Sequence, residues 1–237
     1  MSEKFTPSYL KKRHYNWGVV AVVAALGTCA IVSMFYWQPN GSLSNLIAAN
    51  PESIFSKGDY WRLLTSTFAH ADLEHLLSNS LMLGFLTYFV ASFYGLGVLL
   101  FSFSMGAAIN LATLAQYDAN TTLVGASGVV YFLWGLWLTL YVFIQKNLSV
   151  GKRLMRMGAV FLVLLVPTTY SPQTSYFAHY IGFLMGMISG ALYYLVSPKR
   201  ASKDEILAEL NQEEVESDEW GDPEWEDNLI SDVEAKD

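Results

Sequence analysis

The stretch VGASGVVYFLWGLWLTLYVFI, residues 124–144, decides the fold of this 237-residue chain. It is apolar over almost its whole length and contains no charged side chain. An apolar helix of ~20 residues crosses the ~30 Å hydrocarbon core of a bilayer, so the stretch predicts a transmembrane helix. Near its start, the small-residue sequence Gly125-Ala126-Ser127-Gly128 places a hydroxyl group inside this predicted span.

Other stretches of similar length and composition precede and follow this one. The six predicted spans are Trp17–Trp37, His75–Tyr94, Leu96–Ala115, Val124–Ile144, Leu154–Thr169 and Tyr176–Val196. The fifth is the weakest, because it is short, follows basic residues and contains Pro167. The sequence therefore predicts an all-α membrane protein, built as a six-transmembrane helical bundle.

The composition separates this apolar body from a hydrophilic end. The chain is 53% hydrophobic and only 15% charged, whereas soluble domains average about 25% charged residues. Residues 198–237 hold fifteen acidic and four basic residues, a net charge of −11, so residues 1–197 carry a net charge of +4. We therefore predict an N-terminal segment (1–16), a six-span core (17–197) and an acidic tail (198–237) that is disordered by composition.

Basic residues in short loops predict the orientation, because they are retained on the cytoplasmic side. They cluster before span one, around the loop between spans four and five, and after span six: Lys11, Lys12, Arg13, Lys146, Lys152, Arg153, Arg156, Lys199, Arg200 and Lys203. The alternate loops contribute only Lys57 and Arg62. Both termini are therefore expected in the cytoplasm, and the compact six-span form favours a bacterial cytoplasmic (inner) membrane.

Unusual polar residues occur near the outer ends of spans two, four and six. Span two has His75 and Asn79, which are four residues apart and share one helix face. Ser127 in span four and His179 in span six each lie roughly 5 Å past the expected helix start, at 1.5 Å per residue. Polar groups inside a span are costly and tend to mark function.

Glycines offer a way to bring the two groups together. They follow His179 at Gly182, Gly186 and Gly190, and span four offers a matching groove at Gly125, Gly128 and Gly135. Small residues at such spacing let helix backbones approach closely. The imidazole could then activate the Ser127 hydroxyl as a nucleophile. Because Asp118 is the only acid between Leu76 and Val196, we expect a Ser–His dyad, with Tyr131 as a candidate to orient the imidazole.

Acyl transfer also requires hydrogen-bond donors for the developing oxyanion. His75 and Asn79 lie at the same depth and can donate. The backbone N–H of Ser127 is expected to be unpaired at a helix N-terminus, where the helix dipole is positive. The chain therefore contains candidates for every part of a peptide hydrolase.

These residues resemble the rhomboid family of intramembrane serine proteases. The resemblance covers about residues 15–197 and rests on four motifs in order. They are Trp61-Arg62, His70-(four residues)-His75-(three residues)-Asn79, Gly125-Ala126-Ser127-Gly128, and Ala178-His179-(two residues)-Gly182-(three residues)-Gly186. A lone GxSG is weak evidence, but four motifs in register with a six-span topology are specific.

The resemblance implies a role for each position. Ser127 would be the nucleophile and His179 the general base, with His75, Asn79 and the Ser127 backbone forming the oxyanion hole. Tyr131 would pack on the imidazole, and Gly125, Gly128, Gly182 and Gly186 would support the site. Substrates would be single-span membrane proteins, cleaved in or near the membrane on its outer side. Span five and the outer loop before span six would act as gate and cap, and the loop with Trp61 and Arg62 would lie partly in the membrane.

Other functions remain open at this point. A non-catalytic rhomboid-like binder of transmembrane segments would use the same fold, although such relatives generally lack the serine or the histidine. A small transporter would show an inverted repeat or interrupted helices, which are absent from the sequence. We expect no cofactor and no nucleic-acid partner; the lipid bilayer and an unknown partner of the acidic tail complete the expected contacts.

Several single residues have alternative interpretations. His70, Asp72, Glu74 and His75 suggest a metal site, but a helical zinc pair prefers i, i+4 spacing, so we expect no metal. His70 and Asp72 are instead expected to organise the first outer loop. Asn110 is expected to form a buried hydrogen bond between helices. Other weak signals are a lipoprotein-like LGTC sequence ending at Cys29 and a capping-box pattern at Ser202 and Glu205.

Overall fold

Helices and loops make up the described part of the chain, apart from one isolated bridge between Ala49 and Leu123. The computed structural model describes residues 15–39, 43–119, 121–145, 148–165 and 174–196. The helices are α1 (Gly18–Tyr36), α2 (Ser44–Ile47), the short π-helix η2 (Glu52–Ser56), α3 (Arg62–Phe68), α4 (Leu73–Phe93), α5 (Leu96–Leu114), α6 (Ser127–Ile144), α7 (Val150–Leu165) and α8 (Tyr176–Val196). The predicted all-α class is confirmed.

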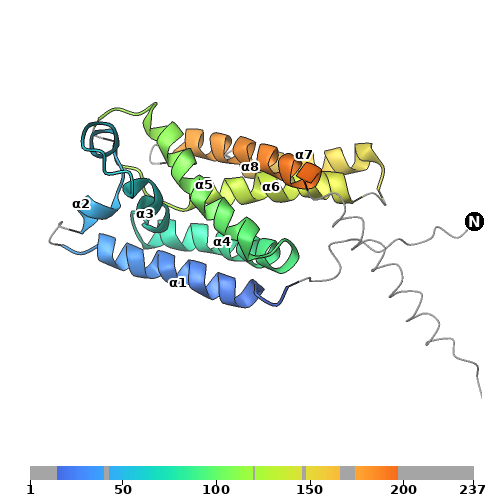
Figure 1. Ribbon diagram of the computed structural model, residues 1–237, viewed down its shortest axis with the longest axis horizontal. Helices are drawn as coiled ribbons and strands as arrows, with labels where there is room; N and C mark the ends of the chain where they lie inside the picture. The colour runs from blue at the N-terminus through green and yellow to red at the C-terminus, as the bar shows by residue number, and fades with distance from the viewer. Residues whose placement is uncertain (1–14, 40–42, 120, 146–147, 166–173, 197–237) are drawn as a thin grey trace, which may run out of the picture.

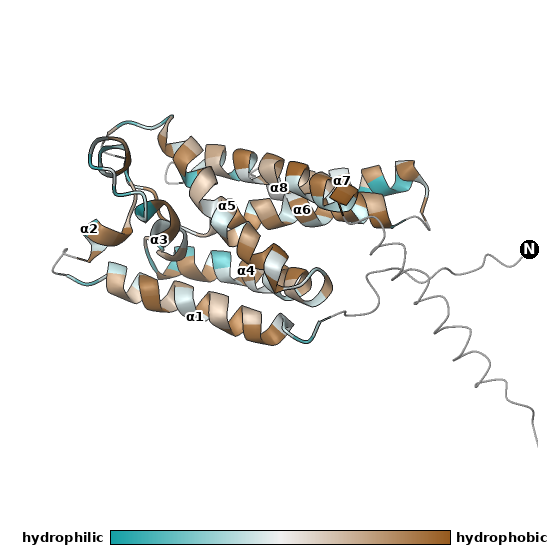
Figure 2. Cartoon of the chain, in the orientation of Figure 1, coloured by the Kyte–Doolittle hydropathy of each residue, from teal (hydrophilic) through white to brown (hydrophobic). Residues whose placement is uncertain are grey.

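Five of these helices are long and apolar enough to cross a membrane, namely α1, α4, α5, α6 and α8. Figure 2 shows that apolar residues cover most of their length, as expected for helices that contact lipid. Each corresponds to one predicted span. The chain is therefore an integral membrane protein, with five candidate spans in the described residues.

Helix α7 occupies the place of the predicted fifth span. Its 16 residues begin at Val150, four residues before the predicted start, and include Lys152, Arg153 and Arg156 in the first two turns. The predicted end of this span at Thr169 and the whole acidic tail lie outside the described residues. The domain boundaries therefore stay a prediction.

The helices pack in pairs, as Figure 1 shows: α8 runs beside α6, α1 runs beside α4, and α5 crosses between the two pairs. At one end of the bundle, the short helices α2, η2 and α3 gather around the ends of the spans. There the indole Nε1 of Trp37, just after α1, donates to the carbonyl oxygen of His70 at 2.8 Å. At the same end, the hydroxyls of Tyr117 and Ser175 are 2.5 Å apart and join the loops after α5 and before α8.

The α6–α8 pair is the most extensive helix contact and is built on glycine. A methyl group at Gly186 would collide with the carbonyl oxygen of Phe132, and one at Gly135 would collide with that of Phe183. A methyl group at Gly182 would lie 2.5 Å from the carbonyl oxygen of Gly128. Any larger side chain would force the helices apart, so the close approach predicted for spans four and six is confirmed.

Helix α6 starts later than hydropathy predicts. It begins at Ser127 and not at Val124, because Gly125 has a φ of 126°, which no helical residue can adopt. The expectation that Ser127 lies about 5 Å inside the helix is therefore wrong, since Ser127 is its first residue. For α8 the prediction is confirmed, because His179 is the fourth residue of a helix that starts at Tyr176.

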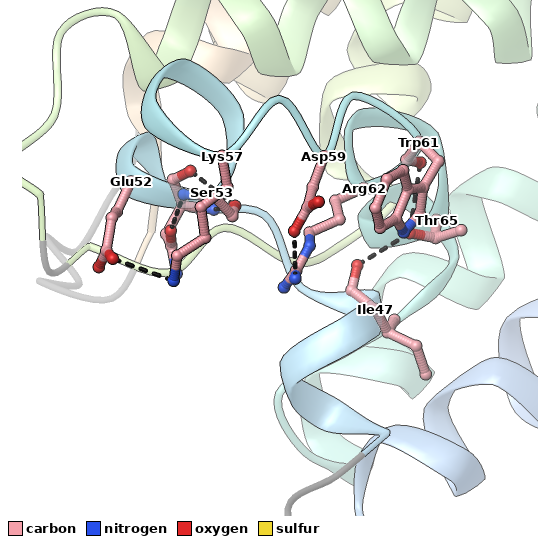
Figure 3. Close-up of polar contacts among 9 residues, drawn as sticks. Ile47, Glu52, Ser53, Lys57, Asp59, Trp61, Arg62 and Thr65 are labelled. Atoms are coloured by element: carbon pink, nitrogen blue, oxygen red, sulfur yellow. Dashed lines mark hydrogen bonds and ion pairs between the residues drawn. The ribbon is translucent and has the colours of Figure 1, made fainter.

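The first loop, which joins α1 to α4, is a folded unit held by short-range polar contacts, drawn in Figure 3. Arg62 at the start of α3 forms a half-buried ion pair with Asp59 at 2.5 Å, and the Thr65 hydroxyl donates to the Ile47 carbonyl at 2.9 Å. Two neighbouring helices hold this unit, because α3 packs mainly against α5 and also contacts α1. The loop therefore forms a fixed structure at the end where the candidate site residues lie.

Candidate active site

Ser127 lies at the N-terminus of α6 and is half-buried. Residue Ala126 occupies the N-cap position and provides no side-chain cap. Among the described residues, no hydrogen bond satisfies the Ser127 N–H, whereas the two N–H groups before it are bound by the first loop. A helix N-terminus with a free N–H group is a favourable place for developing negative charge.

His179 stands one turn into α8, and Ser175 caps that helix. The Ser175 hydroxyl accepts from the Ala178 N–H at 3.3 Å, and the Ser175 carbonyl accepts from the His179 N–H at 3.3 Å. The Tyr117 hydroxyl contacts Ser175 Oγ from the loop after α5. The position of the imidazole along α8 is therefore fixed by contacts just outside the helix.

Neighbours of Ser127 and His179 along the chain lie close together. A methyl group at Gly128 would lie 4.0 Å from the Ala178 carbonyl oxygen, and Gly182 contacts the Gly128 backbone. The two candidate residues therefore occupy facing turns of α6 and α8. No hydrogen bond joins their side chains in the described structure. In ligand-free enzymes the distance between a nucleophile and its general base is often too long for a hydrogen bond, and it shortens only when substrate binds.

The expected contact between Tyr131 and His179 is present. The two rings stack with centroids 4.1 Å apart and an angle of 15° between their planes. Tyr176 approaches the same imidazole edge-on at 6.2 Å. Two aromatic rings therefore restrict the imidazole where the sequence provides no nearby carboxylate.

His75 and Asn79 lie on one face of α4, and the N-terminus of this helix is capped by Asp72. The Asp72 carboxylate accepts from the His75 N–H at 2.7 Å, and the Asn79 amide donates to the His75 carbonyl at 3.0 Å. A side-chain amide has two N–H donors, so this bond leaves Asn79 a second one. Asn79 is buried, and His75 is half-buried.

The His75 ring packs against the loop that precedes Ser127. A Cβ atom at Gly125 would lie 2.8 Å from Cε1 and 3.1 Å from Nε2 of the His75 ring. Gly125 therefore serves two needs: it adopts a positive φ, and it leaves room for the imidazole. The structure thus brings His75 beside the GASG sequence, as expected for members of one site.

Two acceptors from the first loop fix this sequence from the other side. The Ser66 carbonyl accepts from the Gly125 N–H at 2.9 Å, and His70 Nε2 accepts from the Ala126 N–H at 3.4 Å. The next N–H along the chain, that of Ser127, has no hydrogen-bond partner among the described residues. The loop therefore aligns the start of α6 through two consecutive backbone bonds.

His70 is the most buried of the described histidines, with 1% of its surface exposed. Burial, assisted by the nearby His75, lowers the pKa of His70 from 6.5 to about 4, so the ring is neutral at pH 7. Its Nδ1 lies 3.3 Å from the Ser33 hydroxyl, so both ring nitrogens have protein partners. His70 thus organises the first loop, as predicted, whereas Asp72 caps α4. Among the described residues, no group of three metal-ligating side chains occurs.

Sequence reasoning missed several contacts that shape the site. Asn110 forms the expected buried hydrogen bond between helices, but the sequence did not identify its partner, α3, where the acceptors are the Leu63 carbonyl, Ser66 and Thr67. Ser33 and Ser175 were not singled out at all. Ser33 lies in an apolar run, and a single serine in such a run is only a weak indication of a buried hydrogen bond. The position of Ser175 three residues before Ala178 is a capping signal that could have been found.

Together, these features define a membrane protein whose polar site lies just inside one end of an apolar helical bundle. Residues 57–196 match the family model described as the Rhomboid domain. The chain belongs to the rhomboid family. It is also 26% identical over 158 residues to a protein of Bacillus subtilis (strain 168) named "Putative rhomboid protease YdcA", covering 66% of this chain and 75% of that protein.

Proposed function

We propose that the chain is an intramembrane serine endopeptidase, which hydrolyses a peptide bond in or near the transmembrane segment of a membrane protein. The observation that carries the proposal is the placement of Ser127 and His179 on facing turns of α6 and α8. Rhomboid family membership and the name of the Bacillus subtilis relative support it. The chemistry needs no cofactor or metal, and the substrates are single-span proteins in the same bilayer.

The reaction follows from the groups present. The His179 imidazole takes the proton of the Ser127 hydroxyl while Oγ attacks the scissile carbonyl carbon. The Ser127 N–H, His75 and Asn79 donate hydrogen bonds to the oxyanion. The imidazolium then protonates the leaving amine as the C–N bond breaks. Finally, His179 takes a proton from a water molecule whose oxygen attacks the acyl ester, and the imidazolium returns this proton to Ser127 Oγ as the ester C–O bond breaks.

The proposal includes a sixth span and an orientation. Helix α7 would be the remaining span, with Lys152, Arg153 and Arg156 at its cytoplasmic end. Both termini would then be cytoplasmic, and the end of the bundle with Ser127 and His179 would face the outer side of a bacterial inner membrane. A cysteine-accessibility map of single-cysteine variants in intact cells tests this orientation.

The decisive experiment combines labelling with cleavage. The purified full chain in detergent is treated with a fluorophosphonate probe and, separately, with a single-span fusion substrate. We expect covalent labelling of Ser127 and one cut near the outer membrane boundary. Ser127→Ala and His179→Ala should remove cleavage while the thermal unfolding transition is kept.

The outcome also separates the alternative function. A non-catalytic binder would capture the single-span substrate without cutting it and without reacting with the probe. Cleavage by Ser127→Ala at the parent rate would contradict the serine mechanism. A parent chain that neither labels nor cleaves, yet binds the substrate, would favour the binder.

A further inference from the structure

A buried chain of polar contacts runs from the outer end of α1 to the residue before Ser127. The Ser33 hydroxyl lies 3.3 Å from Nδ1 of His70, and Nε2 of His70 accepts from the Ala126 N–H at 3.4 Å. Ser33 and His70 are 0% and 1% exposed. Trp37, one turn after Ser33, holds the His70 backbone. The His70 side chain thus links α1 to α6 across a region that solvent does not reach.

The direction of these hydrogen bonds fixes the tautomer of His70. A backbone N–H can only donate, so Nε2 carries no proton. The neutral ring then has its proton on Nδ1 and donates to Ser33 Oγ. The Ser33 hydroxyl in turn has the Phe68 carbonyl oxygen 3.4 Å away as its acceptor. These bonds satisfy both ring nitrogens, the Ser33 hydroxyl and the Ala126 N–H, and the Phe68 carbonyl is a further hydrogen-bond partner of the His70 ring.

His70 contacts both sides of the oxyanion hole assigned above. On one side it binds the N–H of Ala126, and the next N–H in the chain is that of Ser127. On the other side its ring meets the His75 ring edge-on, with centroids 5.1 Å apart and planes at 74°. A donor that misses its target by a fraction of an ångström loses much of its effect, so a residue that contacts both donors controls their geometry.

We propose that His70 is a positioning residue for peptide hydrolysis, which aligns the Ser127 N–H and the His75 ring, and that Ser33 of α1 and the Ala126 N–H together hold it in the Nδ1–H tautomer. The inference rests on the proposed function. It assigns to α1, which lies before the matched rhomboid segment 57–196, a part in the chemistry. His70 itself does not touch the reacting atoms.

The tautomer can be measured without any proteolysis. The chain has four histidines, at positions 14, 70, 75 and 179, so ¹⁵N-histidine labelling gives a simple spectrum. In the full chain in detergent, we expect one neutral imidazole with its proton on Nδ1, absent from His70→Gln. Ser33→Ala should shift that ring toward the Nε2–H form. A parent spectrum with His70 in the Nε2–H form would overturn the inference.

Kinetics then separate positioning from mere folding. Ser33→Ala and His70→Leu should lower kcat about tenfold or more at an unchanged KM, because the oxyanion donors act in the transition state. His70→Gln should recover most of kcat, since its amide can accept from Ala126 and donate to Ser33. Ser102→Ala is the matched control: it removes a buried hydroxyl that, within the described part of the chain, bonds only the Val98 carbonyl in its own helix.

Each outcome bears on a different claim. An active parent whose Ser33→Ala and His70→Leu variants keep the parent kcat overturns the positioning role alone. Losses that appear only as a lower unfolding temperature, with kcat unchanged for the folded fraction, also overturn it. A parent that does not cleave overturns the proposed function, and the positioning role with it.

Discussion

The ring of Tyr131 lies face to face with the imidazole of His179, at a centroid distance of 4.1 Å. Tyr131 stands one turn after Ser127 on α6, so the same helix carries the candidate nucleophile and the surface on which the candidate base rests. A stacked ring restricts the imidazole plane and leaves its nitrogens available. This contact can take over part of the orienting role that a carboxylate has in a serine triad.

Removing this ring should slow cleavage without abolishing it. Stacked aromatic pairs contribute about 0.5–1.5 kcal/mol, so Tyr131→Leu should lower kcat about two- to tenfold. Tyr131→Phe keeps the ring and should stay closer to the parent rate. Cleavage of a single-span substrate by the two variants measures the difference. Equal rates for Leu and Phe would show that the stacking does not matter.

The glycine contact between α6 and α8 should tolerate no added methyl group. Gly186→Ala places a methyl against the Phe132 carbonyl oxygen, so the helices must separate or the backbone must shift. Overpacking of this kind costs about 1–3 kcal/mol, which should appear as a lower unfolding temperature in detergent, together with lost activity.

Gly158→Ala on α7 is the matched control for this change, because no atom lies within 4 Å of the new methyl. Alanine favours a helix over glycine by about 1 kcal/mol, so this variant should be as stable as the parent or more so. If both variants unfold at the same temperature, the close approach of α6 and α8 does not make an added methyl group at Gly186 destabilising.

The spans could be predicted because hydropathy measures the property that forms them. Trp17 and Trp37 flank α1 as predicted, and the predicted start of α8 at Tyr176 is confirmed. Hydropathy failed at Val124, because it cannot distinguish an apolar helical residue from an apolar loop residue. The start of α6 depends on the positive φ of Gly125, which is set by the first loop.

The contacts around the candidate site were harder to predict than its members. Ser127 and His179 stand out because they are polar inside apolar spans. The partners of His70 do not, since Ser33 lies 37 residues before it and Ala126 lies 56 residues after it. Only the fold brings such positions together. Whether Ser127, His179, His75 and Asn79 perform the predicted roles stays a prediction until activity is measured.

The cap of α8 should contribute to both stability and rate. Ser175→Ala removes the acceptor of the Ala178 N–H, a change that costs about 1 kcal/mol in helix stability, and it loosens the turn that carries His179. We expect a lower unfolding temperature and a lower kcat. Tyr117→Phe, which removes only the hydroxyl that contacts Ser175, should act in the same direction with a smaller effect.

Ser149→Ala provides the comparison for the α8 cap. Ser149 Oγ accepts from the Lys152 N–H at 3.4 Å and so caps α7, which carries none of the candidate catalytic residues. This variant should lose stability with kcat unchanged. A similar drop in kcat for Ser149→Ala and Ser175→Ala would mean that the rate follows overall stability and not the position of His179.

The buried neutral His70 should make the fold sensitive to acid. Its pKa is about 4 in the folded chain and about 6.5 when exposed, so the unfolded state binds the proton first as the pH falls. Stability should therefore be highest above pH 6.5, decrease between pH 6.5 and 4, and change no further below pH 4 through this group. The difference of ~2.5 pKa units corresponds to roughly 3 kcal/mol over this window.

His70→Gln isolates this contribution, because the other titrating groups nearby, Asp72 and His75, are kept in the variant. Unfolding temperatures of the parent and the variant are compared in detergent from pH 7 to pH 4. The parent should lose stability more steeply, and the difference between the two curves should level off near pH 4. Parallel curves would mean that His70 is protonated in the folded chain as readily as in the unfolded one, which is incompatible with an Nε2 atom that accepts from the Ala126 N–H.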